Sequence, residues 1–450
     1  MDRRNAAASI AGSTASEIAE SIRDLRENGV IAAGDTLPPV RALAEQLAVN
    51  RNTVVAAYRL LAQAGIARTF GRGGTRIVDH SPAPQEGFAV DSVLRDVATG
   101  NPDPHRIPDP SAALPAVVGR PVLYGEPIID ERLEDWARTW MAQDMPDREL
   151  HLTVTSGAVD AVERLLAQAL TRDDAVALED PCWLAGIQTA RLGGYRTLPV
   201  AIDAEGMTVE GLQAALDAGA RAIVCTPRAQ NPTGASLSAQ RAAALRTVLA
   251  AHPYVLVIED DHFSLLSQRE FHSIVPPAHH RYALVRSVSK FLGPDMCLAM
   301  VASDATTAGR LALRLSPGTT WVSHLLQRLA HTLLTDDTVR AAIAAAGRHY
   351  AQRNDAFIEL LSTLTDGGDG LAAASGDGLN LWVSTPAPAR DVGEQLMRRG
   401  WLARLGDDFT LSDAASRHLR LTVHDLSDDD AELLARDLVA AVTATVAKVG

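Results

Sequence analysis

From about residue 120 onward, apolar or β-branched runs alternate with helical patterns, and this alternation constrains the fold more than any other feature of the chain. The strand-like runs are LHLTVTS (150–156), AVALED (175–180), RTLPV (196–200), AIVCTP (222–227), VLVIEDD (255–261) and YALVRSVS (282–289). Helical patterns such as AVDAVERLLAQAL and AQRAAALRTVLAAH lie between them. This order predicts an α/β domain built on a mainly parallel sheet. After roughly residue 317 helical patterns dominate, and GLNLWVS and RHLRLTV could pair in a smaller α+β lobe.

The first 80 residues carry the pattern of a small, separate head. Helical patterns cover residues 13–28, 38–48 and 51–64, and Asn50 can cap the third of them. Two β-prone pieces follow, IARTF and TRIV, with GRGG between them. Three helices and a two-stranded wing predict a winged helix-turn-helix.

The charge of this head differs from that of the whole chain. The net charge is −13, yet from Thr36 to Val78 the only acidic residue is Glu45. The same stretch contains the arginines Arg41, Arg51, Arg59, Arg68, Arg72 and Arg76. A basic face on an acidic protein is typical of a DNA-binding module attached to something else, although an arginine-rich face can also be merely solvated. The third helix would enter the major groove with Arg51, Asn52 and Thr53 in its first turn.

Proline-rich sequence separates the head from the α/β pattern. We therefore predict a winged-helix domain over 13–80, a linker over 81–117 and a body over 118–450, with its small lobe from about 317. The amino-terminal residues lack the apolar core of a secretory signal, and no apolar run is long enough to span a membrane. The three cysteines form no CxxC or Cys/His spacing, so we expect neither a disulfide framework nor a metal site. The expected location is the cytoplasm.

Four short segments near predicted strand ends carry the candidate chemistry. They are TSGAVDAV (155–162), NPTG (231–234), IEDDHF (258–263) and SVSK (287–290). In parallel α/β sheets, ligands bind at the carboxyl ends of strands, so these segments are expected to meet.

The residue types suit pyridoxal phosphate. Lys290 would form the Schiff base with the aldehyde, buried Asp260 would keep the ring nitrogen protonated, and Trp183 would cover the ring face. Arg420 would bind a ligand carboxylate. Hydroxyl and amide groups for the phosphate would come from Ser156, Gly157, Ala158, Ser287 and Ser289.

At these motifs the chain resembles a known family. Residues 13–80 look like the GntR-type winged helix, through GDTLPPVRALAEQLAVNRNTVVAAYRLLAQAG and the GRGGTRIV wing. Residues from about 95 to 445 look like a fold-type-I aminotransferase, through TPRAQNPTG, EDD and SVSKFLGPD at matching spacing. The combination, with the linker phrase TGNPDPHRIPDPSAAL, resembles the MocR subfamily of GntR-type regulators.

The resemblance implies a multidomain protein that binds double-stranded operator DNA as a head-to-tail homodimer with shared cofactor sites. Tyr124, in LYGEP, would serve the partner's phosphate site, and Asn231 and His262 would contact the cofactor. The residues expected to contact DNA are Arg41, Arg51, Asn52, Thr53 and Arg72.

Three positions depart from the family pattern. Cys297 stands seven residues after the lysine, where an arginine usually binds the phosphate; His262 replaces a tyrosine; Asn380 replaces a histidine. Loss of the arginine removes a charge-assisted hydrogen bond, roughly 1.5–3 kcal/mol, unless the nearby Arg286 compensates.

The combined pattern predicts a regulator that senses an amino compound, or pyridoxal phosphate itself, through an aldimine at Lys290. Two alternatives remain open: a working aminotransferase with a secondary DNA-binding head, and a body that keeps the fold without the cofactor. Each site residue also has an ordinary structural explanation. Trp183 can be a core aromatic, Arg420 a salt-bridge arginine and His262 a structural histidine.

Overall fold

The computed structural model describes residues 9–32, 34–63, 66–69, 74–77, 93–315, 321–365, 370–373, 376–412 and 414–449. The chain divides into two compact units, residues 1–84 with 190–194 and the remainder. We call residues up to 84 the head and residues from 85 the body, and describe each by itself. The described part of the predicted linker, 93–117, falls in the body; the predicted boundaries at 80 and 117 remain predictions.

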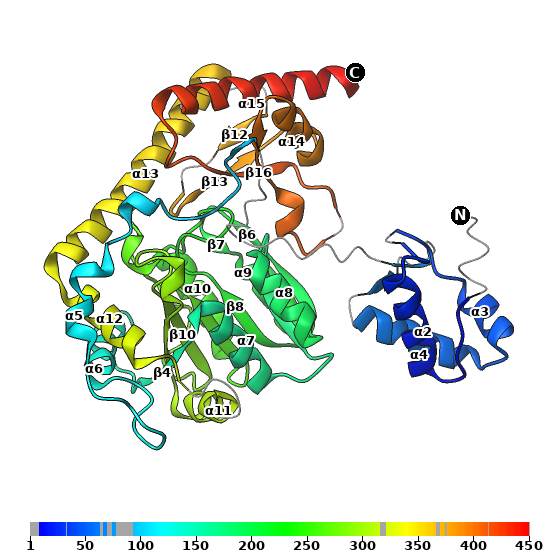
Figure 1. Cartoon of the computed structure of the whole chain (residues 1–450), viewed down its shortest axis with the longest axis horizontal. Helices are drawn as coiled ribbons and strands as arrows, with labels where there is room; N and C mark the ends of the chain where they lie inside the picture. The colour runs from blue at the N-terminus through cyan, green and yellow to red at the C-terminus, as the bar shows by residue number, and fades with distance from the viewer. Residues whose placement is uncertain are drawn as a thin grey trace. The chain divides into compact units, whose positions relative to one another are not determined.

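The head contains the three helices and the wing that the sequence predicts (Figure 1). They are α2 (Ala15–Glu27), α3 (Val40–Leu47), α4 (Arg51–Gln63), β1 (Ala67–Thr69) and β2 (Thr75–Ile77), the strands pairing antiparallel. Thr14 and Glu17 form a reciprocal capping box on α2, and Asn50 accepts a hydrogen bond from the Asn52 amide at the start of α4. Ile18, Ile22, Leu43, Val54 and Leu61 are fully buried in the head's own core.

The body is built on an eight-stranded sheet with the order β4-β11-β10-β9-β8-β5-β6-β7. The strands are β4 (His151–Thr155), β5 (Ala175–Asp180), β6 (Arg196–Asp203), β7 (Gly206–Met207), β8 (Ala220–Cys225), β9 (Leu256–Asp260), β10 (Tyr282–Ser287) and β11 (Ala299–Ser303). The six predicted strands are all present, and β5, β6, β8, β9 and β10 pair in parallel. β11, which we did not predict, is antiparallel between β4 and β10.

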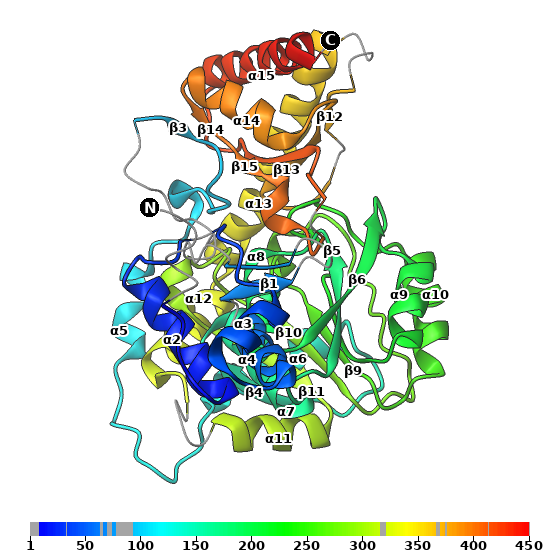
Figure 2. The ribbon, with the colours of Figure 1, turned by 90° about the vertical axis from the view of Figure 1, so that its right-hand side faces the viewer.

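Helices cover this sheet (Figures 1 and 2). They are α5 (Leu114–Val117), α6 (Glu131–Ala142), α7 (Gly157–Ala169), α8 (Leu184–Gly193), α9 (Val209–Asp217), α10 (Ala239–Ala250), α11 (Ala305–Leu315) and α12 (His324–Thr335). The core beneath them is aliphatic, with Leu133, Leu245, Val257 and Leu284 fully buried. Among the described residues, no helix combines the length and apolar character that crossing a membrane requires.

The long helix α13 (Asp337–Thr365) leads into the small lobe (Figure 1). Its sheet has the order β12-β13-β16-β15, and its helices are α14 (Ala389–Arg398) and α15 (Asp428–Val449). The strands are β12 (Ala372–Ala373), β13 (Asn380–Ser384), β15 (Arg404–Leu405) and β16 (His418–Thr422). β13 and β16 are the two predicted strands, and they pair antiparallel as expected.

Residues 95–103, which we call the docking segment, lie on the small lobe. β3 (Arg95–Asp96) pairs in parallel with β14 (Trp401–Leu402), and Val97 is fully buried. The sequence interpretation of 81–117 as a linker did not anticipate this packing. The docking segment is held mostly by main-chain hydrogen bonds. Such bonds do not depend on side-chain type, so they leave no hydrophobic periodicity in the sequence.

Candidate cofactor site and DNA-binding head

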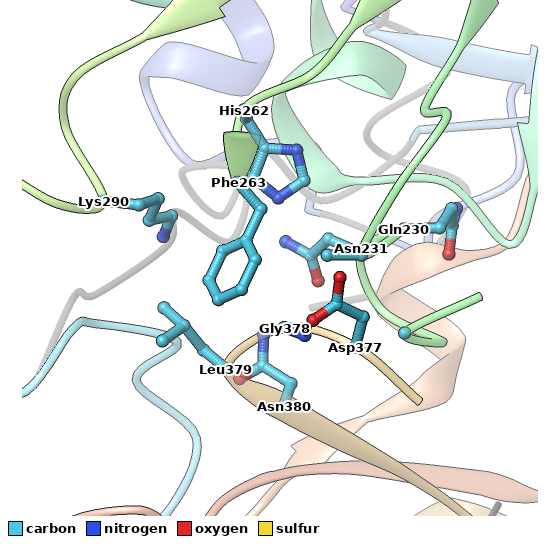
Figure 3. A pocket seen from close by; sticks show the side chains of 11 residues that line it. Gln230, Asn231, His262, Phe263, Lys290, Asp377, Gly378, Leu379 and Asn380 are labelled. Atoms are coloured by element: carbon cyan, nitrogen blue, oxygen red, sulfur yellow. Dashed lines mark hydrogen bonds between the residues drawn. The ribbon is translucent and has the colours of Figure 1, made fainter. Parts of the chain in front are cut away.

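Three parallel strands bring the predicted motifs to one edge of the large sheet. Asp260 on β9 is in register with Val285 on β10, and Glu259 is in register with Cys225 on β8. The segments that follow these strands therefore emerge together. Asn231, His262 and Lys290, from these segments, line one pocket. Gly378–Asn380 of the small lobe line the same pocket (Figure 3).

Lys290 lies three residues beyond the end of β10 and is half-buried. Its Nζ donates a hydrogen bond to the main-chain oxygen of Gly100, 2.9 Å away. Gly100 belongs to the docking segment, so the candidate Schiff-base amine contacts the stretch that leads back toward the head.

Asp260 is buried at the end of β9, and its Oδ1 has no hydrogen-bond partner among the described residues. Burial, followed by the nearby carboxyl groups of Asp261 and Glu179, raises the pKa of Asp260 to about 7. A buried carboxyl oxygen without a donor is costly, so this position is suited to a ligand that brings an N–H group.

The neighbouring Asp261 is held in the opposite state. Burial acts to raise its pKa, but the guanidinium groups of Arg286 and Arg228 outweigh burial and lower it. Arg286 is fully buried, pairs with Asp261 and Asp144, and stacks on the Trp140 ring. The two carboxylates hold Nε and Nη2 of Arg286, whereas its Nη1 has no hydrogen-bond partner among the described residues, so compensation by Arg286 for the missing phosphate arginine stays a prediction.

The predicted phosphate cradle lies at the amino terminus of α7. Thr155 on β4 and Ser287 on β10 are both in register with Ala299 on β11, so both strands end at the same level. Ser156 and Gly157 follow Thr155, and the Cys297 Sγ lies 3.6 Å from the main-chain oxygen of Ser156. Ser287 is buried, whereas Ala158 and Ser289 are half-buried. Cys297 thus lies at the cradle, where the family pattern places an arginine.

Arg420 is fully buried on β16. Its Nη1 donates to Asn231 Oδ1 at 3.1 Å, and its Nη2 donates to the main-chain oxygen of Ala98 at 2.7 Å. Its guanidinium also lies over the Phe409 ring. The structure therefore places Arg420 beside one other predicted residue, Asn231, and beside the docking segment.

Of the predicted cofactor and effector residues, Asn231, His262 and Lys290 line this pocket. The others do not line it: Ser156, Gly157, Ala158, Asp260, Ser287, Ser289, Arg420 and the aromatic residues Trp183 and Tyr124. Trp183 is half-buried, and its indole fills the space beside Gly186, where an added Cβ would meet it. Tyr124 is 90% exposed, with its ring edge-on to Trp321. Within one chain, Tyr124 contributes nothing to the pocket.

On the head, the candidate DNA contacts lie on α3 and α4. Arg51 and Asn52 are exposed and Thr53 is half-buried, all in the first turn of α4. Arg41 on α3 is exposed and its Nε bonds Glu45 on the same helix at 2.9 Å. Arg72 lies outside the described residues. In the described part of the chain no group of three or more His, Cys, Asp or Glu side chains could hold a metal ion.

Comparison with known families and proteins agrees with this architecture. The family described as "Aminotransferase class I and II" matches residues 124–438, and "Bacterial regulatory proteins, gntR family" matches residues 14–77. The chain is 44% identical to the vitamin B6 salvage pathway transcriptional repressor PtsJ of Salmonella typhimurium, over 95% of this chain and 98% of that protein. The chain belongs to the MocR subfamily of GntR-type transcription regulators. It is a DNA-binding transcription regulator with a pyridoxal-phosphate-binding body of the aminotransferase fold.

More distant proteins share parts of the MocR architecture. The pyridoxine biosynthesis regulator PdxR of Corynebacterium glutamicum is 28% identical over 66% of this chain and 67% of its own length. The kynurenine aminotransferase structure from Pyrococcus horikoshii aligns with 78% of this chain and 91% of its own, at a TM-score of 0.71 and 19% identity. The structure of the α-aminoadipate aminotransferase LysN from Thermus thermophilus aligns with 79% of this chain and 94% of its own, at a TM-score of 0.69 and 20% identity. At these identities the two structures establish the fold alone.

Proposed function

We propose that this regulator controls vitamin B6 salvage genes by sensing pyridoxal phosphate at Lys290. The name of the 44%-identical repressor supports the choice of genes. The observation that carries the choice of ligand is that Lys290 and the buried, unpartnered Oδ1 of Asp260 both lie at or just beyond the carboxyl ends of neighbouring parallel strands, β10 and β9. We also propose the cytoplasm as its location, which a role in binding promoter DNA supports.

The residues present fit the cofactor. The Asp260 carboxyl would accept the ring N–H that its orphan oxygen lacks, and Lys290 would supply the amine. When bound, pyridoxal phosphate supplies an aldehyde that condenses with amines and a ring that withdraws electrons. Asn231 and His262, which line the pocket, would contact the ring. Trp183, from the loop before α8, does not line the pocket in this structure and is proposed to cover the ring face. Its phosphate would be held by Ser156, Gly157, Ala158, Ser287 and Ser289.

Two partners complete the proposal. A homodimer is supported by exposed apolar side chains close to Tyr124 in the sequence, Val118 and Leu123, and by Leu325 on α12, which are 81%, 64% and 58% exposed. Exposed apolar side chains favour burial against a second copy, where Tyr124 would reach the partner's phosphate site. An amino compound with a carboxylate is a second effector class, because Arg420 can pair with it.

We expect the purified protein to gain visible absorbance on titration with pyridoxal phosphate, and Lys290→Ala to gain none, because only the amine can condense with the aldehyde. The same protein should retard its own promoter DNA at low salt, and saturation with the cofactor should change that affinity. Lys290→Ala should retain DNA binding but lose the response. Absence of DNA binding at low salt, or a cofactor response that survives in Lys290→Ala, would contradict the proposal.

The alternative of a working aminotransferase is favoured by Arg420 and Asp260 together, since a transaminating enzyme needs both. Half-reactions with a panel of amino acids separate the two functions. Multiple turnovers at ordinary enzyme rates of about 1–10³ s⁻¹ would favour the enzyme.

We expect Cys297→Arg to tighten the binding of pyridoxal phosphate by about tenfold to hundredfold, because it restores a charged donor at the cradle beside Ser156. The apparent dissociation constant from the absorbance titration measures this. Cys297→Ser is the matched control and should leave the constant unchanged within about threefold. An arginine variant that binds no tighter than Cys297→Ser would argue against Ser156 as part of the phosphate cradle.

A further inference from the structure

The docking segment presents its main-chain oxygens to three nitrogen-bearing side chains, two of which belong to the proposed ligand site. Arg420 Nη2 bonds the oxygen of Ala98 at 2.7 Å, and Lys290 Nζ bonds that of Gly100 at 2.9 Å. His424 Nε2 bonds the oxygen of Asn101 at 2.9 Å. Two of these three side chains are the ones that we assign to the cofactor aldehyde and to an effector carboxylate.

Most of the other hydrogen bonds from this stretch to the rest of the chain go to the small lobe, and one, from the Asp103 amide, goes to the Tyr350 hydroxyl on α13. The Val97 amide bonds the Leu402 oxygen at 2.9 Å, and the Val97 oxygen accepts from the Thr422 amide at 2.8 Å. The Gly100 amide donates to Thr422 Oγ1 at 3.0 Å. Lys290 instead stands on the loop after β10 of the large sheet. The bond from Lys290 to Gly100 therefore joins the large sheet to a segment whose other bonds go mostly to the small lobe.

From this geometry we propose that the Gly100 carbonyl and the cofactor compete for Lys290, so that cofactor binding releases the docking segment from the large sheet. The inference rests on the proposed function, in which cofactor occupancy controls DNA binding. The inference adds a structural element, residues 95–103, whose release would transmit the effect of cofactor binding from the pocket to the rest of the protein.

The competition follows from the chemistry of the amine. A protonated lysine carries three N–H donors, one of which serves Gly100. To react, Lys290 first gives one proton to solvent, and its nitrogen then adds to the aldehyde carbon. The aldehyde oxygen leaves as water with the two remaining hydrogens, and a carbon–nitrogen double bond forms. The Lys290 nitrogen is left with no N–H, or with one if it is reprotonated, and its direction is then set by the cofactor and not by Gly100.

The docking segment follows the head in the sequence, so its release could affect DNA binding. Among the described residues, β3 is the first strand beyond the head, and it joins the body through β14. Loosening residues 95–103 would loosen the first described part of the body that follows the head in the sequence. A ligand controls DNA binding only through such a difference between states, and the Lys290–Gly100 bond supplies one.

Hydrogen exchange of the full-length protein tests this inference. In wild type, saturation with pyridoxal phosphate should accelerate exchange of peptide amides in 95–103 by about tenfold, because one charge-assisted hydrogen bond is broken. Lys290→Met should exchange at the faster rate without cofactor, since it lacks the donor. Lys290→Arg keeps a cationic donor but cannot condense, so its exchange should stay slow and unresponsive. Peptides of α15 within 431–442 report whether each variant is folded.

The outcomes separate this inference from the proposed function. Unchanged or slower exchange in cofactor-saturated wild type overturns the inference, even if the cofactor still alters promoter binding. Equal exchange in wild type and Lys290→Met without cofactor also overturns it. Faster exchange on cofactor binding with unaltered promoter binding supports the release of the segment but overturns the proposed regulation.

Discussion

Asp260→Asn should weaken binding of pyridoxal phosphate by about 150- to 5,000-fold. The variant keeps the shape of the side chain but cannot carry the negative charge that would stabilise a protonated ring nitrogen. Breaking a buried charged pair costs about 3–5 kcal/mol, and this range sets the expected loss. The absorbance titration proposed for wild type measures it directly. Asp260 is suited to the role because it is buried and its Oδ1 has no partner in the described structure.

Without cofactor, Asp260→Asn should increase the stability of the folded protein at high pH. Since the pKa of Asp260 is raised from 3.8 to about 7 in the folded chain, the folded state retains a proton that the unfolded chain releases above about pH 4. The free energy of unfolding therefore falls as the pH rises from about 4 to 7. Asp260→Asn removes this contribution, so the cofactor-free variant should gain stability over wild type at pH 8 compared with pH 5. Denaturant unfolding at the two pH values measures the difference.

Glu259→Gln is the matched control for the measurement of cofactor affinity. Burial raises the pKa of Glu259 to about 7 as well, and its carboxyl accepts hydrogen bonds from Ser273 and from the Ile274 amide. As the neighbour of Asp260 in β9, Glu259 points to the opposite face of the sheet. It should share the pH effect but leave cofactor affinity unchanged. Equal cofactor affinity in Asp260→Asn and Glu259→Gln would remove Asp260 from the proposed site.

The sequence predicted the convergence of the site because that convergence follows from a topological rule. Asp260 and Lys290 follow separate apolar runs, and parallel strands place their carboxyl ends at one edge. The position of β11 did not follow, because an apolar run indicates burial without indicating strand direction. The burial of Asp260 was expected, whereas its lack of a partner depends on every neighbour and emerged only from the structure.

Side-chain partners distant in sequence were the least predictable part of the site. The sequence left Arg286 as a candidate to bind the cofactor phosphate, and gave no sign that Asp144 and Asp261 form ion pairs with it. Gly100 carried no sign of its hydrogen bond with Lys290, because a main-chain oxygen is present in every residue. The TGNPDP sequence was interpreted as part of a linker. In the structure its glycine, Gly100, has a φ of 62°, a left-handed conformation that favours glycine. A glycine in such a turn beside prolines is the signal that could have suggested an ordered segment.

On the head, the double variant Arg41→Ala with Arg51→Ala should weaken operator binding by about 100-fold or more. In a dimer it removes four guanidinium groups, and the salt-dependence slope falls by about one for each phosphate that is no longer neutralised. Both side chains are exposed, at the amino-terminal turns of α3 and α4. Fluorescence anisotropy with promoter DNA, repeated at several salt concentrations, measures affinity and slope together.

Arg436→Ala provides the matched control for this effect. Arg436 on α15 pairs with Glu432 one helical turn earlier, as Arg41 pairs with Glu45, and both arginines are mostly exposed. Exposed pairs of this kind contribute only about 0–1 kcal/mol to stability, so neither substitution should unfold its domain. Arg436→Ala should therefore leave operator affinity and salt slope unchanged. If the head variant loses affinity while its salt slope equals that of wild type, the two arginines do not contact phosphates, and base contacts from Arg51 must account for the loss.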